Sequence, residues 1–307
     1  MKSKLIGNLQ AIRMAERLVQ GNMYMPVLIT GEAGLGQEIL AMEIAAEILG
    51  VENPEEHGNY FALKPKQGTI RVSDVEELLE ISRISAHKGS PKVLGIYSIG
   101  CMTIQAQNRL LKLLEDRNEK NVILITLEGS EGAVLDTIKS RTVHIPLKRV
   151  STVEMKKFLK KMHESEDLDV YMAVLRGCPY RYASTKEKID VYKAIYHKQL
   201  EIRGKEDILY MLHEAREKDR NAFYDKNREC VQGFLDMEFS IFEKLLLWKE
   251  GGIQVFADPR YRNLNRQYSE QDVYRILLSI VEQKRRIGIP GQYTRLDFSA
   301  FIRELCQ

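Results

Sequence analysis

The chain of 307 residues is long enough for two or three domains. Hydrophobic residues make up 44% and charged residues 29% of it, a balance that excludes a disordered chain, a collagen-like repeat and a disulfide scaffold. The formal net charge is only +3, so any contact with nucleic acid would need a local basic patch. The cysteines are widely separated and lack zinc-ligand spacing, which predicts reduced, structural thiols.

We expect no leader peptide and no membrane-spanning segment. Residues 1–11 contain no apolar stretch of the kind found in a leader. No run of about 18 apolar residues occurs along the chain. These features predict a cytoplasmic protein with no membrane partner.

The first half of the chain alternates between short apolar runs and helical patterns. In chain order we expect a helix over 9–19, a strand over 26–30, a helix over 39–49, a helix that a Ser73/Glu76 capping box opens and that continues to 81, a strand over 92–97, a helix over 104–115, and strands over 121–126 and 143–146. Such alternation predicts a parallel sheet covered by helices on both faces.

After residue 146 the strand signals disappear, and the rest of the chain is predicted to be helical or irregular. Capping boxes predict further helix starts at Ser151/Glu154, Ser184/Glu187 and Ser269/Asp272. The stretch 251–268 contains the longest predicted irregular segment. The pattern therefore predicts an α/β domain, a small helical unit and a larger helical domain.

A glycine-rich segment lies between the strand over 26–30 and the helix that follows it. Gly31, Gly34 and Gly36 have the spacing of a phosphate-binding P-loop, but Gln37 and Glu38 stand where that motif has a lysine and a hydroxyl residue. An amide cannot balance the charge of the phosphates, and a carboxylate repels them. Taken alone, the segment is equally compatible with a plain glycine turn.

The second half of a magnesium–nucleotide site is also missing from the sequence. The strand over 92–97 runs into Ser98, with no aspartate or glutamate to hold Mg²⁺ or orient water. Losing the lysine, the hydroxyl and the acidic residues together argues against ATP hydrolysis.

Two further motifs resemble those of the bacterial DNA polymerase III clamp-loader subunits, a branch of the AAA+ proteins. Residues 107–116 resemble the family stretch Q-N-A-L-L-K-x-L-E-E, although Arg117 and Asn118 replace the two prolines that usually follow. Residues 135–145 are similar to the motif L-x-T-I-x-S-R-C, with Thr142 in place of the cysteine. The degenerate P-loop together with the retained Ser-Arg pair is most similar to the delta-prime type of subunit.

The resemblance implies an AAA+ core with a degenerate P-loop over 1–148, a helical lid over 149–190 and a helical collar over 191–307. Many family members carry a four-cysteine zinc module after the P-loop helix, but here the interval 51–60 contains no cysteine. We therefore expect no zinc, no other metal and no bound ATP.

The same resemblance implies that Ser140 and Arg141 form a trans-acting arginine finger. Arg141 would reach the ATP of a neighbouring subunit, while this chain, as part of the polymerase III nucleotidyltransferase holoenzyme, would have no ATPase activity of its own. The implied partners are the gamma/tau ATPase subunits and delta, with the sliding clamp and primer–template DNA met through the complex. A plain surface arginine at a helix end is the alternative for Arg141.

Two other positions match sensor residues of the family. Thr126 ends a predicted strand at the sensor 1 region, and Arg181 lies near the sensor 2 position, with Arg176 as a competitor. For Arg181, a salt bridge or a solvated side chain is the preferred interpretation. For the chain as a whole, the alternatives are an AAA+ ATPase with atypical nucleotide binding and a diverged AAA+ adaptor outside replication.

Overall fold

The structure is a computed structural model that describes residues 3–21, 25–84, 91–115, 121–162, 166–190, 192–193, 196, 228–251 and 259–287. The chain divides into two compact units, and each is described by itself. Unit 1 comprises residues 1–151 and 178–180, and unit 2 comprises residues 152–177 and 181–307.

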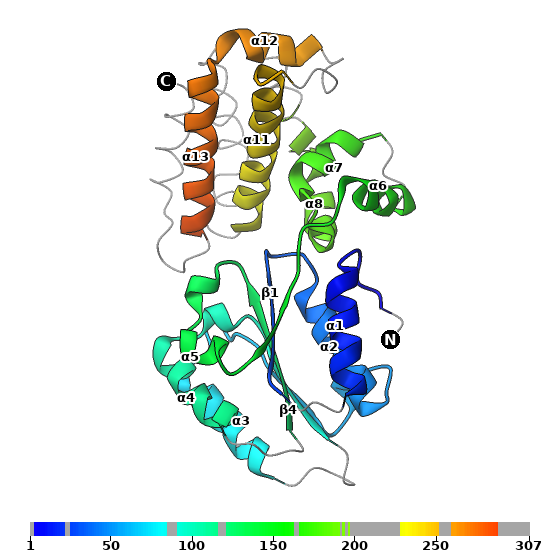
Figure 1. Ribbon diagram of the computed structural model, residues 1–307, viewed down its shortest axis with the longest axis vertical. Helices are drawn as coiled ribbons and strands as arrows, with labels where there is room; N and C mark the ends of the chain where they lie inside the picture. The colour runs from blue at the N-terminus through cyan, green and yellow to red at the C-terminus, as the bar shows by residue number, and fades with distance from the viewer. Residues whose placement is uncertain are drawn as a thin grey trace. The chain divides into compact units, whose positions relative to one another are not determined.

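Unit 1 is built on a parallel sheet that has five strands among the described residues, in the order β2-β3-β4-β1-β5. The strands are β1 Val27–Gly31, β2 Tyr60–Leu63, β3 Lys92–Ile96, β4 Asn121–Glu128 and β5 Val143–Pro146 (Figure 1). Strand β1 lies between β4 and β5, so the loop that follows β1 begins between the carboxyl ends of these two strands.

Helices cover both faces of this sheet, because its strands are apolar on both sides. Val27 and Ile29 face one buried cluster, whereas Leu28 between them faces the other. Helices α1 Leu9–Gln20 and α2 Gln37–Leu49 lie on the first face, and α3 Val72–Arg83, α4 Ile104–Glu115 and α5 Asp136–Lys139 lie on the second (Figure 1). The predicted parallel sheet, covered on both faces, is confirmed.

Three details of unit 1 differ from the sequence prediction. Strand β2 was not predicted, and β4 continues two residues past Thr126. The proposed Ser73/Glu76 capping box is wrong: α3 begins at Val72, and the Asp74 carboxylate accepts a hydrogen bond of 2.8 Å from the backbone N–H of Arg71. Asp74 takes this position because its short carboxylate reaches back three residues to the helix start.

Unit 2 is helical throughout its described residues. Its helices are α6 Thr152–Lys161, α7 Leu168–Leu175, α8 Tyr182–Lys186, α11 Arg228–Lys249, α12 Pro259–Gln267 and α13 Glu270–Ile287. Unit 1 also contains short 3₁₀ turns at Pro54–Glu56, Ile99–Cys101 and Glu131–Ala133, and a fourth, Pro179–Arg181, lies where the chain passes from unit 1 to unit 2. The α/β-then-helical organisation is thus confirmed. Helices α7, α11 and α13 contribute to one buried cluster, and the predicted division at residue 190 stays a prediction.

The cap predictions in unit 2 had different outcomes. The Ser269/Asp272 box is confirmed: Asp272 N donates to Ser269 Oγ at 3.1 Å, and Ser269 N donates to the Asp272 carboxylate at 2.9 Å. The Ser184/Glu187 box is wrong, because Ser184 lies inside α8 and its hydroxyl donates to Arg181 O at 3.1 Å.

Part of the stretch predicted to be irregular is helical. Helix α12 occupies 259–267. Tyr261 and Leu264 on this helix, and Tyr268 directly after it, are buried in the cluster of unit 2. Their apolar spacing is diluted by arginine and asparagine, which hid the helical pattern. Within the described ranges, no helix combines the length and apolar character needed to cross a membrane.

The degenerate phosphate loop and the arginine site

The glycine-rich loop joins the end of β1 to the start of α2, as the sequence predicts. Gln37, the first residue of α2, is fully buried and its side chain lies inside the loop. Its Nε2 donates hydrogen bonds to Glu32 O at 2.9 Å and to Leu127 O of β4 at 3.4 Å. The amide therefore ties the loop to itself and to the neighbouring strand instead of extending toward a phosphate. Gln37 Oε1 is buried with no hydrogen-bond partner among the described residues.

The loop and the first turn of α2 carry two acidic side chains, one of which is paired with an arginine. Glu32 forms a two-pronged ion pair with Arg149, with Nε–Oε1 and Nη2–Oε2 distances of 2.8 and 2.7 Å. Glu38 occupies the first turn of α2, where its negative charge interacts favourably with the helix dipole. The positive end of α2 thus already has an acidic side chain, and a polyphosphate would meet two carboxylates.

A second segment of unit 1 covers the loop at Gly36, the N-cap of α2. A Cβ atom built at Gly36 would lie 2.6 Å from Leu5 Cδ1 and 2.6 Å from Tyr180 Cε2, so both side chains press on the glycine backbone. Tyr180 N also donates to Gly34 O at 3.1 Å. The space over the helix N-terminus, where a P-loop would hold phosphate, is therefore filled by the chain itself.

The Tyr180 side chain that covers Gly36 is held in place at its hydroxyl group. The Tyr180 hydroxyl accepts a hydrogen bond of 2.8 Å from Ile6 N and donates one of 3.0 Å to Lys4 O. Burial raises the pKa of Tyr180 above its usual range, so the hydroxyl keeps the proton that it donates. We use the name plug for Leu5 and Tyr180 together. Sequence reasoning missed both residues, because their proximity to the loop is created only by the tertiary fold.

No carboxylate follows the carboxyl end of β3, which lies two strands away from β1 in the sheet. Ser98 follows β3 in a left-handed conformation with φ of 56°. Its backbone N–H donates to the Thr126 hydroxyl of β4 at 2.9 Å. Thr126 is fully buried, and this bond connects the ends of two adjacent strands. In the register of the sheet, Thr126 pairs with Ile29 of β1.

The Ser140–Arg141 pair lies at the end of the sheet where the strands begin, whereas the loop lies at the end where they finish. Arg141 precedes β5, whose first residue, Val143, pairs with the first residue of β1. The loop instead follows the last residue of β1, about 13 Å farther along the strand direction. Arg141 therefore cannot serve the loop of its own chain.

The local contacts of Arg141 leave much of its guanidinium in solvent. The side chain is 40% exposed, donates to Thr137 O at 3.0 Å, and pairs with Glu115 Oε1 at 3.0 Å. The Ser140 hydroxyl also donates to Thr137 O, at 3.1 Å. Ser140 thus closes the last turn of α5, and Arg141 projects from a helix end that the buried Ile138 anchors.

Gln107 of the first motif holds this arginine-bearing segment against α4. Its Nε2 donates to Ala133 O at 2.8 Å, and its Oε1 accepts from Leu135 N at 3.0 Å. Gln107 is buried, so both hydrogen bonds are shielded from water. Sequence reasoning used this glutamine only to recognise the motif, and the structure gives it a physical role.

Arg181 lies in unit 2, in a buried cluster of charges around Asp236. The Asp236 carboxylate contacts Arg181 Nη1 directly, Lys284 Nζ at 2.6 Å and Arg176 Nη1 at 3.9 Å. Although burial alone would raise the pKa of Asp236, the charges of Arg181 and Lys284 hold it below its usual range. Both sensor 2 candidates thus form ion pairs within unit 2.

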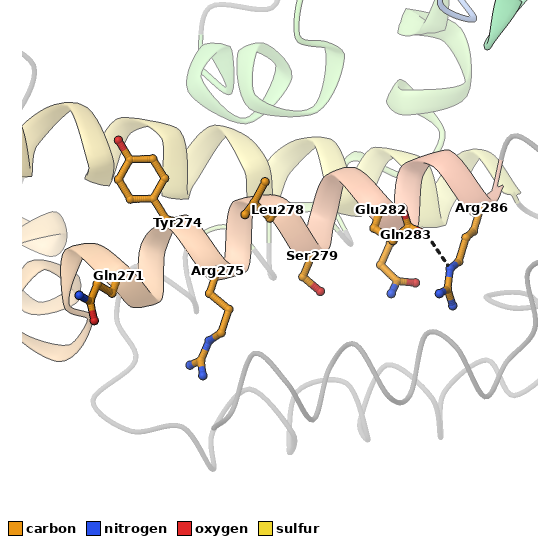
Figure 2. A pocket seen from close by; sticks show the side chains of 8 residues that line it. All are labelled: Gln271, Tyr274, Arg275, Leu278, Ser279, Glu282, Gln283 and Arg286. Carbon is orange, nitrogen blue, oxygen red and sulfur yellow. Dashed lines mark hydrogen bonds and ion pairs between the residues drawn. The ribbon is translucent and has the colours of Figure 1, made fainter. Parts of the chain in front are cut away.

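A pocket of about 650 Å³ lies along one side of α13. Figure 2 shows Arg275, Ser279 and Arg286 on this side, with Arg286 joined to Glu282. The described lining residues all come from α13 and include none of the predicted site residues. Among the residues that the structure describes, no group of three or more His, Cys, Asp or Glu side chains could hold a metal ion.

Comparison with known proteins relates unit 1 to replication proteins. Residues 8–151 match the family described as "DNA polymerase III, delta subunit". The chain is 31% identical over 135 residues to DNA polymerase III subunit delta' of Pseudomonas aeruginosa, covering 38% of this chain and 40% of that protein. It is 25% identical over 187 residues to the same subunit of Haemophilus influenzae, covering 54% and 56%. The chain thus matches about half the length of these curated relatives.

Among solved structures, the fold is similar to a DNA polymerase III gamma subunit-related protein of Thermotoga maritima. That comparison has a TM-score of 0.49 and 17% sequence identity, over 96% of this chain and 98% of the other.

The parallel sheet with a glycine loop after β1, followed by a helical unit, is the arrangement expected from the sequence for an AAA+ core and its helical domains. Over the matched residues, the family model and the curated relatives make this chain similar to the delta-type subunits of DNA polymerase III.

Proposed function

We propose that this chain is a non-hydrolysing, delta-prime-like subunit of the DNA polymerase III clamp loader. In this proposal it binds no ATP in its own loop and offers Arg141 to the ATP site of a neighbouring subunit. Its partners are the gamma/tau ATPase subunits and delta. ATP turnover in those neighbours is coupled to placing a sliding clamp on primer–template DNA.

The observation that carries the proposal is the filled phosphate loop. Gln37 turns inward onto the loop and β4, and Tyr180 covers the N-terminus of α2. A nucleotide would have to displace the plug and approach Glu38 without a lysine to balance its charge. These features favour a subunit that takes part in ATP turnover without a site of its own.

The position of Arg141 supports a role in trans. The arginine is 40% exposed and lies near the start of β5, at the end of the sheet away from its own loop, and its acidic partner Glu115 is 55% exposed. An exposed ion pair of this kind is worth at most about 1 kcal/mol, so a phosphate can replace Glu115 at little cost. The planar guanidinium is also well suited to binding phosphate oxygens in pairs.

The test is the DNA-stimulated ATPase activity of a loader assembled from this chain and the other subunits of its source. An arginine finger contributes on the order of 10³ to 10⁵ in rate at one site. Because the sites of the other subunits keep their own chemistry, we expect Arg141→Ala to abolish turnover at one site and to lower the activity of the complex by that site's share. Unchanged activity in a fully assembled complex would contradict the proposal for Arg141.

Glu115→Gln is the matched control. It removes the partner of Arg141 and leaves the arginine itself, so ATPase activity should stay close to that of the unmodified complex. Arg141→Ala should change the free energy of unfolding by no more than about 1 kcal/mol, which separates lost catalysis from lost folding. Tight, magnesium-dependent ATP binding by the isolated chain would contradict the non-hydrolysing assignment.

A further inference from the structure

Helix α6 of unit 2 has a basic face with no acidic partner among the described residues. Lys156, Lys157, Lys160 and Lys161 are all exposed, and none forms an ion pair or hydrogen bond with another described residue. We call these four residues the lysine face. The helix contains one acidic residue, Glu154, so its formal charge of +3 equals that of the whole chain.

Helical geometry gathers these lysines on one side of α6. At 100° per residue, the four positions span about 140° of the helix surface, opposite the buried residues Met155 and Leu159. Those buried residues pack with Tyr171 and Leu175 of α7. The lysine face therefore points away from the core of unit 2.

The arrangement weakens the helix. Lys156/Lys160 and Lys157/Lys161 are like-charge pairs four residues apart, and each such pair destabilises a helix by roughly 0.2–0.5 kcal/mol. The helix dipole offsets part of this for the last turn only. A polyanion bound along the face would remove this repulsion.

The basic residues at the end of α13 have acidic partners, in contrast to those of α6. Lys284 pairs with the buried Asp236, and Arg285 and Arg286 both pair with Glu282. The lysine face is thus a local basic patch of the kind that the small net charge of the chain requires for contact with nucleic acid.

We propose that the lysine face of α6 binds the phosphate backbone of duplex DNA. Protein interfaces are depleted in lysine, whereas flexible ammonium groups suit a row of phosphates. The neighbouring aromatic residue, Phe158, packs edge-to-face with Tyr182 at 5.6 Å, so it does not offer a stacking platform for single-stranded bases. The choice of DNA among polyanions rests on the proposed function.

Binding should be independent of sequence, because phosphate contacts carry no base information. Contacts of this kind give dissociation constants of about 10⁻⁴ to 10⁻⁶ M near physiological salt. Each lysine that contacts a phosphate contributes about 0.9 to the slope of log K against log salt concentration.

The test is fluorescence anisotropy of a labelled 20-base-pair duplex with the full chain over a salt series. We expect K156Q/K160Q and K157Q/K161Q each to weaken binding and to reduce the salt slope by about 2. The matched control is R13Q/R17Q, which removes two exposed charges four residues apart on α1. This variant should bind DNA like the unmodified chain.

Three results would overturn the proposal. One is equal DNA affinity of the unmodified chain and both lysine variants. Another is an equal loss in R13Q/R17Q, which would mean that only net charge matters. A third is tighter binding of a polyglutamate peptide than of the duplex, which would assign the face to an acidic protein. Glutamine has nearly the helix propensity of lysine, so the melting temperature of the variants should not fall. The assay needs no ATPase subunit, so its outcome is independent of the test of Arg141.

Discussion

At the scale of single residues, substitution of Gly36 tests how closely the plug packs over the glycine-rich loop. Its φ is +98°, and a side chain there would collide with Leu5 and Tyr180. We expect Gly36→Ala to lower the free energy of unfolding by about 1–3 kcal/mol, from backbone strain and the collision together. Chemical denaturation of the purified chain measures this change.

Gly50→Ala separates the two causes. Gly50 also has a positive φ, +66°, but has open space around its missing Cβ, so only the backbone strain applies. We expect the smaller loss there, about 1 kcal/mol. In a Tyr180→Ala background, where the ring is absent, the further loss caused by Gly36→Ala should be smaller than in the unmodified chain. Equal losses at Gly36 and Gly50 would contradict the close packing of the plug.

Asp236 is the residue whose charge state matters most in unit 2. Its carboxylate balances Arg181 and Lys284 in a buried site, and removing one partner of a buried ion pair costs about 3–5 kcal/mol. We therefore expect Asp236→Asn to lower the free energy of unfolding by this amount at pH 7. Asp136→Asn is the control, because Asp136 is exposed and pairs with Lys139 at the surface; we expect no measurable change there.

The lowered pKa of Asp236 predicts how the free energy of unfolding depends on pH. The folded-state pKa of Asp236 lies below that of an unfolded aspartate, about 3.9. Its contribution to stability is thus fully present above about pH 4 and is lost as the pH falls through the folded-state pKa. Denaturation between pH 3 and pH 7 should show a shallower acid loss for Asp236→Asn. A parallel loss in both proteins would contradict the ion cluster.

At the scale of elements, the start of α13 provides a test of helix capping. Ser269 accepts a hydrogen bond from Asp272 N, whereas the Ser184 hydroxyl donates to the carbonyl of Arg181, the N-cap residue of α8. We expect Ser269→Ala to cost about 1 kcal/mol. Ser184→Ala should cost less, because it removes no bond to a free helix N–H. Thermal unfolding of the two variants gives the comparison, and the reverse order would contradict the observed caps.

These two serines also show where sequence reasoning succeeds and fails. The capping pattern was the same for both, and it succeeded where the helix starts at the serine and failed where the chain was already helical. Long elements with regular apolar spacing, such as α4 over 104–115, were predicted with their observed bounds. Strand β2 was missed, because four residues at the sheet edge give too short a pattern.

The candidate site, too, was predicted from the sequence in part and missed in part. The sequence indicates a degenerate loop, because the missing lysine and acidic residues are local features. It gives no sign of Tyr180 covering Gly36, since the two residues are far apart in the chain and meet only in the folded unit. It also leaves open whether Arg181 is solvated, and its partner Asp236 lies 55 residues away.

At the scale of the whole molecule, a small net charge conceals an uneven distribution. The chain carries +3 in total, yet α6 alone carries the same charge on an exposed face. Elsewhere in the described residues, many basic side chains are paired, as at Glu32, Asp236 and Glu282. A binding surface for a polyanion is therefore compatible with a nearly neutral protein.

The two units have separate buried clusters, which predicts how the whole chain unfolds. The clusters of unit 1 lie on the two faces of the sheet, and those of unit 2 lie among its helices. Calorimetry should therefore resolve two transitions. Gly36→Ala should lower the midpoint of one transition, and Asp236→Asn should lower that of the other. The double variant should show both shifts unchanged, since distant, independent sites contribute additively. A single transition that either substitution lowers would mean that the units unfold cooperatively.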